Sequence, residues 1–295
     1  MTAVPITHVG IVAKSRLQAA TPHLVEVESW LASRGITAVF ETATAALMPA
    51  SAARAVADKQ ALVTRVGLVL VLGGDGTLLS MADCIANLGR PVPILGVNFG
   101  SLGFLTEVTL PELYPALEAS LAGRARVEER LMLRATTIRP SAAAQLGLAV
   151  NDVVINRAAR SRLIDLSVFV GDEFVTRVRA DGLIIATPTG STAYNLSAGG
   201  PVIEPSVDAL VLTPIAPHTL SNRPIVIPAS ATVRVKPLMG ERDEAFVTFD
   251  GQAGFELQSG DEISVTRAGE PMRLIRPATR SYFEVLREKL NWGQR

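Results

Sequence analysis

The sequence predicts a two-part fold, an α/β domain built on a doubly wound parallel sheet followed by an all-β, sandwich-like domain. In the first third of the chain, short apolar runs alternate with helical patterns, as in parallel strands joined by crossover helices. The following part is dominated by short strand-like runs separated by turn residues. The length of 295 residues also exceeds the usual ~100–200 residues of one domain, which favours two.

The α/β domain is predicted from four strands and three helices in alternation. Apolar runs predict strands at Val9–Ala13, Ile36–Phe40, Val66–Leu72 and Ile94–Val97. Helical spacing predicts helices at Leu17–Arg34, Thr77–Leu88 and Pro111–Leu121. Because the run Val66–Leu72 has no polar alternation, it is typical of a strand buried on both faces in a Rossmann-like or flavodoxin-like sheet.

The β-rich part has short apolar runs with turns between them. Strands are expected at Leu131–Ile138, Leu148–Ile155, Leu163–Val170, Phe174–Arg179, Leu183–Ala186, Val233–Pro237, Phe246–Asp250, Ile263–Thr266 and Met272–Ile275. Tyr282–Trp292 returns to helical spacing, and a lone amphipathic helix needs a surface to cover, so we expect it to dock back on the first domain. The expected domains are therefore 1–127 (α/β), 128–276 (β-rich) and 277–295 (the returning helix).

Composition narrows the classes of partner. The 28 basic and 28 acidic residues balance, which argues against a general nucleic-acid binder. A single cysteine, Cys84, excludes an internal disulfide. No apolar stretch reaches the ~18 residues of a membrane span, and the N-terminal residues lack a signal-peptide core. We expect a cytoplasmic protein that binds discrete small molecules and neither nucleic acid nor membrane.

The segment Gly73-Gly74-Asp75-Gly76-Thr77 directly follows the buried strand Val66–Leu72. Glycines at the carboxyl end of such a strand allow a tight turn and close approach of a ligand, and the next helix presents unpaired N–H groups suited to phosphate. The alternative is that Asp75 is only the N-cap of that helix, but a cap does not need three glycines. The Gly-Lys-Ser/Thr of a Walker phosphate loop is absent.

A second segment, Asp181–Pro201, interleaves glycine with small hydroxyl residues after an apolar strand. Its hydroxyls and backbone donors would suit a ribose or phosphate lining. By composition alone it could equally be a surface loop.

Together these segments resemble the NAD kinase family. Four stretches carry the resemblance: Gly73–Gly76, Asn98–Leu105, Asn151–Val154 and Asp181–Pro201. The match runs from about Val66 to Val226 and resumes at Tyr282-Phe283. Diacylglycerol and sphingosine kinases share only the first stretch, and phosphofructokinases share it more loosely.

The resemblance implies an enzyme that transfers the γ-phosphoryl of ATP, or in some members polyphosphate, to the 2′-hydroxyl of the adenosine ribose of NAD. A divalent cation, Mg²⁺ by expectation, would be held with the ATP phosphates and not by a dedicated protein site. Family members are commonly dimeric or tetrameric, so a homodimer or homotetramer is expected, with the dinucleotide where the two domains meet.

The resemblance also implies roles for particular residues. Asp75 would be the catalytic carboxylate, accepting the proton of the acceptor hydroxyl and organising the metal. The phosphate loop would be Gly73, Gly74, Gly76 and Thr77. Binding of the dinucleotide would involve Asp75, Gly76, Asn151, Asp152, Arg162, Arg179, Asp181, Thr189, Thr192, Ala193, Tyr194, Asn195, Leu196, Ser197 and Gln252.

Two alternative functions belong to other classes of protein. A lipid kinase of the diacylglycerol or sphingosine type would share the first motif, but it would not need the Asp181–Pro201 pattern and should present an apolar or basic face to membranes. A non-catalytic dinucleotide-binding regulator would keep the nucleotide contacts without turnover.

Overall fold

Separate hydrophobic cores divide the chain into two units. The computed structural model describes residues 5–100, 102–139, 143–158, 163–219, 221–240, 243–277 and 279–293. The first unit comprises Met1–Glu129 together with Met272–Arg295, and the second comprises Arg130–Pro271. The chain therefore leaves the first unit once and returns to it at its end.

The first unit contains a seven-stranded sheet in the order β3-β2-β1-β4-β5-β19-β6. The strands are β1 (His8–Ala13), β2 (Thr37–Glu41), β3 (Ala55–Ala57), β4 (Leu68–Gly73), β5 (Ile94–Asn98), β6 (Arg126–Arg130) and β19 (Met272–Arg276). All pairs from β3 across to β19 are parallel. The chain runs outward from β1 to β3 and then continues on the other side of β1 with β4 and β5, so the strand order reverses between β1 and β4. In open α/β sheets, ligands bind at this switch point, beyond the carboxyl ends of the strands.

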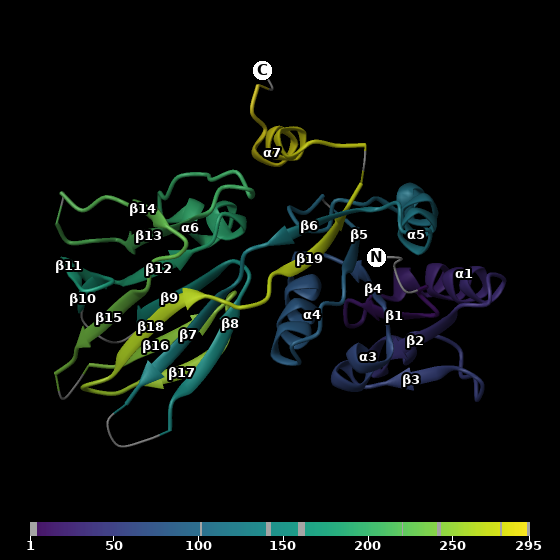
Figure 1. Cartoon of the computed structure of the whole chain (residues 1–295), viewed down its shortest axis with the longest axis horizontal. Helices are drawn as coiled ribbons and strands as arrows, with labels where there is room; N and C mark the ends of the chain where they lie inside the picture. The colour runs from purple at the N-terminus through teal and green to yellow at the C-terminus, as the bar shows by residue number, and fades with distance from the viewer. Residues whose placement is uncertain are drawn as a thin grey trace. The chain divides into compact units, whose positions relative to one another are not determined.

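Helices cover both faces of this sheet (Figure 1). They are α1 (Thr21–Ala32), α2 (Thr42–Ala45), α3 (Lys59–Arg65), α4 (Asp75–Asn87) and α5 (Leu113–Leu121), with short 3-10 turns at Gln18–Ala20 and Leu110–Glu112. The C-terminal helix α7 (Tyr282–Leu290) belongs to the same unit. Apolar residues of α1 and α5 share a core with Leu68, Leu70 and Leu72 of β4. On the opposite face, Leu62 of α3 lies against Gly10 and Leu78 of α4 against Gly96. Burial of β4 on both faces explains its uninterrupted Val/Leu sequence.

The second unit is a sandwich of two six-stranded sheets. One has the order β11-β10-β15-β18-β7-β8 and the other β14-β13-β12-β9-β16-β17. The first sheet is made of β7 (Leu133–Ile138), β8 (Gln145–Ala149), β10 (Ile164–Val170), β11 (Glu173–Ala180), β15 (Val233–Leu238) and β18 (Glu262–Arg267). The second is made of β9 (Asp152–Arg157), β12 (Gly182–Ala186), β13 (Ala209–Ile215), β14 (Ile225–Pro228), β16 (Ala245–Phe249) and β17 (Gln252–Leu257).

Alternate residues of both sheets meet in one core, as a sandwich requires. The outer face of the β12 sheet has a second, smaller core with Ile184, Ala186 and Ile203. The Thr/Gly-rich segment contributes to that face through a 3-10 turn at Thr189–Thr192 and the short helix α6 (Tyr194–Ser197), seen in green beside β12 in Figure 1. The predicted fold class, an α/β domain followed by antiparallel β-structure and a C-terminal helix, is confirmed.

Three local expectations need correction. The expected strand Leu148–Ile155 is two strands, β8 and β9, in different sheets. The run Met272–Ile275, assigned to the β-rich domain from sequence, is β19 and pairs with β5 in the α/β sheet, where Figure 1 shows it in yellow. The helix expected from Thr77 begins at Asp75, with Gly74 as its N-cap. None of the helices in the described parts of the chain is both long and apolar enough to cross a bilayer.

Candidate active site

In the first unit, the site is organised around the carboxylate of Asp75. Its Oδ2 accepts the backbone N–H of Phe104 at 2.9 Å. Its Oδ1 accepts the N–H groups of Leu105 (3.2 Å) and Thr106 (2.9 Å) and the Thr106 hydroxyl (2.9 Å). Asp75 is therefore not a helix cap, because its hydrogen bonds reach a loop that follows the next strand. Oδ1 has three donors and Oδ2 has one, so Oδ2 keeps acceptor capacity for a further donor.

The loop that supplies these donors is held close to the carboxylate. A Cβ at Gly103 would lie 2.1 Å from Asp75 Oδ1, so this approach is possible only for glycine. After this loop, Val108 forms an isolated parallel bridge with Val97 of β5, so the chain returns to the side of β5 and runs in the same direction. The Asn98 side-chain amide also donates to the Thr106 hydroxyl at 3.3 Å. The Asp75 geometry thus depends on a chain reversal at the end of β5.

A cavity opens at the switch point beside Asp75. It lies at the carboxyl ends of β1 and β4, and its lining includes Lys14, Lys59, Gly74, Gly76 and Thr77. The Lys59 ammonium donates to the Ser80 hydroxyl of α4 at 2.7 Å. Glu41 also lines the cavity, and its carboxylate accepts hydrogen bonds from the N–H and hydroxyl of Thr44. The two lysines and the first turn of the 13-residue helix α4 are the groups suited to an anionic ligand.

In the second unit, Asp250 orders the start of β9. Its carboxylate accepts the N–H groups of Val150 (2.9 Å), Asn151 (2.7 Å) and Asp152 (3.1 Å). These bonds take up the donors that would otherwise continue the β8 ladder, so the chain crosses to the other sheet here. Asp250 and the following Gly251 both have positive φ, 51° and 69°, in the turn between β16 and β17. An Asp-Gly pair is favoured at such a turn.

The carboxyl of Asp152 is buried beside this turn. The residue is 3 % exposed, and its carboxyl receives no hydrogen bond from the described residues. Burial, with a smaller contribution from the nearby Asp250 charge, raises the pKa of Asp152 to about 7. A buried carboxyl group of this kind can accept hydrogen bonds from the hydroxyls of a ligand.

The Thr/Gly-rich segment packs against Asn151. Thr187 donates its N–H to the Asn151 carbonyl (2.9 Å) and its hydroxyl to the Val150 carbonyl (2.6 Å). A Cβ at Gly190 would lie 2.0 Å from the Asn151 carbonyl oxygen, so the backbones touch. Asn151, Asp152 and the 187–190 turn thus form one polar cluster at one end of the β9–β12 pair.

Asn195 holds this segment in shape. It is fully buried, its amide donates to the carbonyls of Ser191 and Pro201, both at 3.0 Å, and its oxygen accepts the Thr213 hydroxyl at 2.6 Å. Its hydrogen-bonding groups are therefore used internally. The neighbouring Tyr194 is exposed and available to a ligand.

Asp181 lies at the opposite end of the same strand pair. Gly182 is opposite Asn156, whereas Ala186 is opposite Asp152. A strand of this length spans roughly 15 Å, so Asp181 and Asp152 are not neighbours. The Asp181 carboxylate instead pairs with Arg157. Arg179 is exposed near this end, on β11.

The chain matches two domain families. The ATP-NAD kinase N-terminal domain matches residues 9–125, and the ATP-NAD kinase C-terminal domain matches residues 150–277. The chain is 48% identical to the NAD kinase of Geotalea daltonii over 92% of its own length and 93% of that protein. It is 53% identical to the NAD kinase of Geobacter metallireducens, over 77% and 80% of the two chains.

The chain belongs to the NAD kinase family. It is therefore an enzyme, a kinase that binds nucleotides, and the lipid-kinase and regulator alternatives are set aside. Two solved members of the family share its fold. A yeast NADH kinase complexed with NADH has a TM-score of 0.89 at 28% identity, covering 99% of this chain and 89% of that one. An NAD kinase from Archaeoglobus fulgidus in complex with ATP has a TM-score of 0.74 at 25% identity, covering 95% and 99%.

The structure groups the residues singled out from sequence into three places, of which one is the end of the β9–β12 pair that carries Asp181, with Arg179 near it. The first unit brings together Gly73, Gly74, Asp75, Gly76 and Thr77. The second unit clusters Asn151 and Asp152 with the turn at Thr189, and the exposed or half-buried Thr192, Ala193, Tyr194, Leu196 and Ser197 follow. Gln252 is exposed at the start of β17, two residues after Asp250, and Arg162 lies outside the described residues.

Sequence reasoning missed Asp250, Lys14, Lys59 and the Phe104–Thr106 amides. Asp250 had a usable signal, because Asp-Gly after an apolar run predicts a turn. Within the described ranges, no group of three or more His, Cys, Asp and Glu side chains is placed to hold a metal ion.

Burial of Asp152 predicts a specific pH dependence of stability. In the unfolded chain its carboxyl ionises near pH ~4, whereas in the folded protein it does so near pH 7. The contribution of this carboxyl to the free energy of unfolding is therefore fully present below pH ~4 and is lost as the pH rises through 7. The difference in unfolding free energy between Asp152→Asn and wild type should therefore shift in favour of the variant by up to ~4 kcal/mol from pH 4 to pH 8. Urea unfolding of both proteins at both pH values measures this shift.

Asp172→Asn is the matched control for this measurement, because Asp172 is fully exposed in the same unit. Its stability relative to wild type should change little between the two pH values. If the unfolding free energies of Asp152→Asn and wild type differ by the same amount at pH 4 and pH 8, burial does not raise the pKa of Asp152 as described.

Proposed function

We propose that this enzyme transfers the γ-phosphoryl of ATP to the 2′-hydroxyl of the adenosine ribose of NAD, giving NADP and ADP, with a divalent cation such as Mg²⁺. The observation that carries the proposal is the Asp75 carboxylate, oriented by four donors and retaining acceptor capacity on Oδ2. The two solved relatives, one complexed with NADH and the other with ATP, support the same substrate classes.

In this reaction Asp75 Oδ2 accepts the proton of the ribose hydroxyl. The hydroxyl oxygen forms a bond to the γ-phosphorus as the bond from that phosphorus to the β,γ-bridging oxygen breaks, and ADP leaves. Phosphoryl transfer depends mainly on alignment and charge neutralisation, so one oriented carboxylate supplies the acid–base step. Because Oδ1 is occupied by three donors, rotation of the carboxyl group is opposed and the reacting oxygen stays aimed.

We place the donor phosphates in the cavity at the β1/β4 switch point. Lys14 and Lys59 supply positive charge, and the Gly73–Thr77 turn and the first turn of α4 supply backbone donors. The cation would be held by the ATP phosphates together with Asp75, because Mg²⁺ is usually bound by substrate phosphates and one or two carboxylates. When bound, it would neutralise charge on the transferring phosphoryl group.

We place NAD on the second unit's cluster. Asn151 and Asp152 would form hydrogen bonds with the ribose hydroxyls and the amine of NAD. Thr189, Thr192 and Tyr194 would contact the rest of the dinucleotide. The same proposal includes Gly76, Arg162, Arg179, Ala193, Leu196, Ser197 and Gln252 as contacts. Asn195 acts in it by shaping the loop. Asp181 would meet a more distant part of the ligand, since it lies at the other end of β12.

We also propose a homodimer or homotetramer acting in the cytoplasm. Edge strands β11 and β14 of the second unit expose Phe174, Val175, Ile225 and Val226, and unpaired apolar edges favour association. Light scattering of the purified protein should give a multiple of the 31.2 kDa chain mass, and a monomer would reject the assembly.

Asp75→Asn tests the catalytic assignment. An amide cannot accept the ribose proton, so turnover of NAD and ATP with Mg²⁺ should fall by about 10²-fold or more, while NAD affinity measured by calorimetry changes little. Product is detected with a dehydrogenase that accepts only NADP. Asp83→Asn, on the same helix α4, is the control and should keep wild-type turnover. Wild-type protein without product would refute the function, and an active Asp75→Asn would refute only the residue's role.

Lys14→Met and Lys59→Met test the donor site. Loss of a charge-assisted contact to phosphate costs about 1.5–3 kcal/mol, so each should raise the KM for ATP by roughly 10-fold or more and leave the KM for NAD unchanged. Lys236→Met, which removes a surface ion pair with Glu262 in the second unit, is the control. A rise in the KM for NAD alone would place the dinucleotide, and not ATP, at this cavity.

A further inference from the structure

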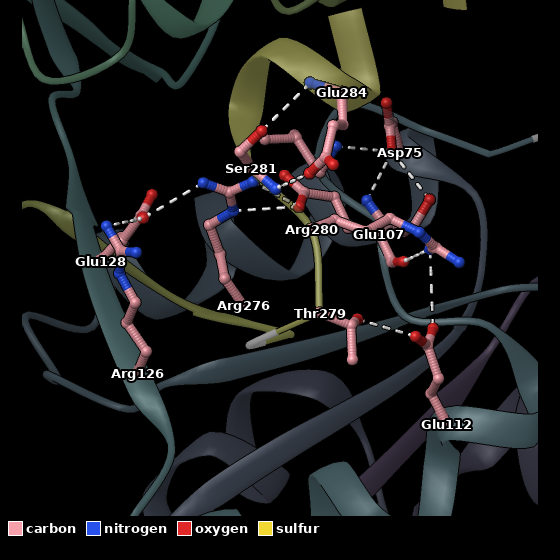
Figure 2. A network of polar contacts seen from close by, with 12 residues as sticks. Asp75, Glu107, Glu112, Arg126, Glu128, Arg276, Thr279, Arg280, Ser281 and Glu284 are labelled. Atoms are coloured by element: carbon pink, nitrogen blue, oxygen red, sulfur yellow. Dashed lines mark hydrogen bonds and ion pairs between the residues drawn. The ribbon is translucent and has the colours of Figure 1, made fainter. Parts of the chain in front are cut away.

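The residue that follows the Asp75-binding loop is a buried glutamate. Glu107 is 2 % exposed and comes directly after Thr106, which gives both its N–H and its hydroxyl to Asp75. Figure 2 shows the polar network on the Glu107 side of this loop, in which residues of the returning C-terminal segment meet Glu107, Glu112 and Glu128. A buried carboxylate requires such partners, because an unpaired one would be strongly destabilising.

Arg276, the last residue of β19, binds the Glu107 side chain. Its Nε and Nη2 donate to Glu107 Oε2 at 3.0 and 2.6 Å, and its Nη1 donates to Glu128 at 3.1 Å. Burial opposes the charge of this guanidinium, but hydrogen bonds and the charges of Glu107 and Glu128 outweigh burial and raise the pKa of Arg276. The ion pair therefore stays charged and anchors Glu107 to the sheet.

Arg280 binds the loop backbone. Its Nη1 donates to the carbonyl oxygen of Glu107 at 2.9 Å and lies 3.6 Å from a carboxylate oxygen of Glu112. Thr279 donates its hydroxyl to the other Glu112 oxygen at 2.9 Å. Burial tends to raise the pKa of Glu112, but hydrogen bonds from Thr109 and Thr279 and the charge of Arg280 lower it overall, so Glu112 holds Arg280 as an anion.

We infer that Arg280 is a positioning residue for catalysis, which acts by holding the Glu107 carbonyl, with Arg276 holding the Glu107 carboxylate, so that the Phe104–Thr106 donors stay on Asp75. The inference rests on the proposed function, in which Asp75 accepts the ribose proton. Val108 is bonded to β5, and Glu107 is the residue that links it to the three donor residues. Without the contacts of Arg276 and Arg280 to Glu107, this link would be free to move and the three amides could shift. A misplacement of about 1 Å at a reacting group can cost on the order of 10²-fold in rate.

Arg280→Met tests this inference, because methionine keeps an apolar stem of similar length and has no donor. We expect kcat to fall about 10-fold or more, with the KM values for NAD and ATP within about 2-fold of wild type. Arg280→Lys retains a cationic donor and should recover most of the lost kcat. Arg273→Met is the matched control, since Arg273 lies on β19 and pairs with Glu129 and the Pro91 carbonyl, away from the loop. It should keep wild-type kcat.

A double-mutant cycle separates positioning from general weakening. If Arg280 acts through Asp75, Arg280→Met should lower the rate much less in an Asp75→Asn background than in wild type. Equal losses in both backgrounds would overturn the inference. A selective rise in the KM for ATP would also overturn it, because Arg280 would then contact the donor directly.

Amide hydrogen exchange provides a readout that does not depend on activity. Arg280→Met should increase deuterium uptake in a peptide covering Phe104–Thr106, and Arg273→Met should not. Unchanged uptake there would refute the inference even if the enzyme phosphorylates NAD. If the wild-type protein yields no NADP but Arg280→Met still increases deuterium uptake at Phe104–Thr106, the proposed function is refuted and the loop contact stands.

Discussion

Four hydrogen-bond donors converge on one carboxylate in the first unit, and the geometry of its site depends on them. Asp75 is the first residue of α4, at the carboxyl end of a strand buried on both faces, so its backbone position is set by the sheet. The donors come from a loop after the neighbouring strand, and they set the direction of the side chain. A charged group held in this way costs little reorganisation when it reacts.

The second unit uses the same device at Asp250. Its carboxylate accepts three consecutive backbone N–H groups at the crossing from one sheet to the other, as the Asp75 carboxylate does with the Phe104–Thr106 loop. A glycine permits close approach at each place, Gly103 at the Asp75 oxygen and Gly190 at the Asn151 carbonyl. Each unit thus brings residues distant in sequence to one point through a half-buried aspartate.

Local patterns predicted the parts of the site that are contiguous in the chain. The Val/Leu run with its glycines predicted the strand, turn and helix around Asp75, and the Asp181–Pro201 composition marked the second segment. The contacts that organise them join residues 31, 99 and 169 positions apart, which no local pattern encodes. For the same reason β19 was assigned to the wrong domain, since its partner strand β5 lies far back in the chain. The internal role of Asn195 likewise depends on Thr213, on another strand.

In the proposed reaction, the Asp75 carboxylate, held by the Phe104–Thr106 loop, accepts the proton of the adenosine ribose 2′-hydroxyl. A crystal structure of the enzyme with NAD and a non-hydrolysable ATP analogue tests it most directly. We expect the 2′-oxygen within hydrogen-bond distance, about 2.6–3.2 Å, of Asp75 Oδ2, with the donors from the loop still in place. A 2′-oxygen that lies against another side chain, or an Asp75 turned out of its amide donors toward solvent, would contradict it.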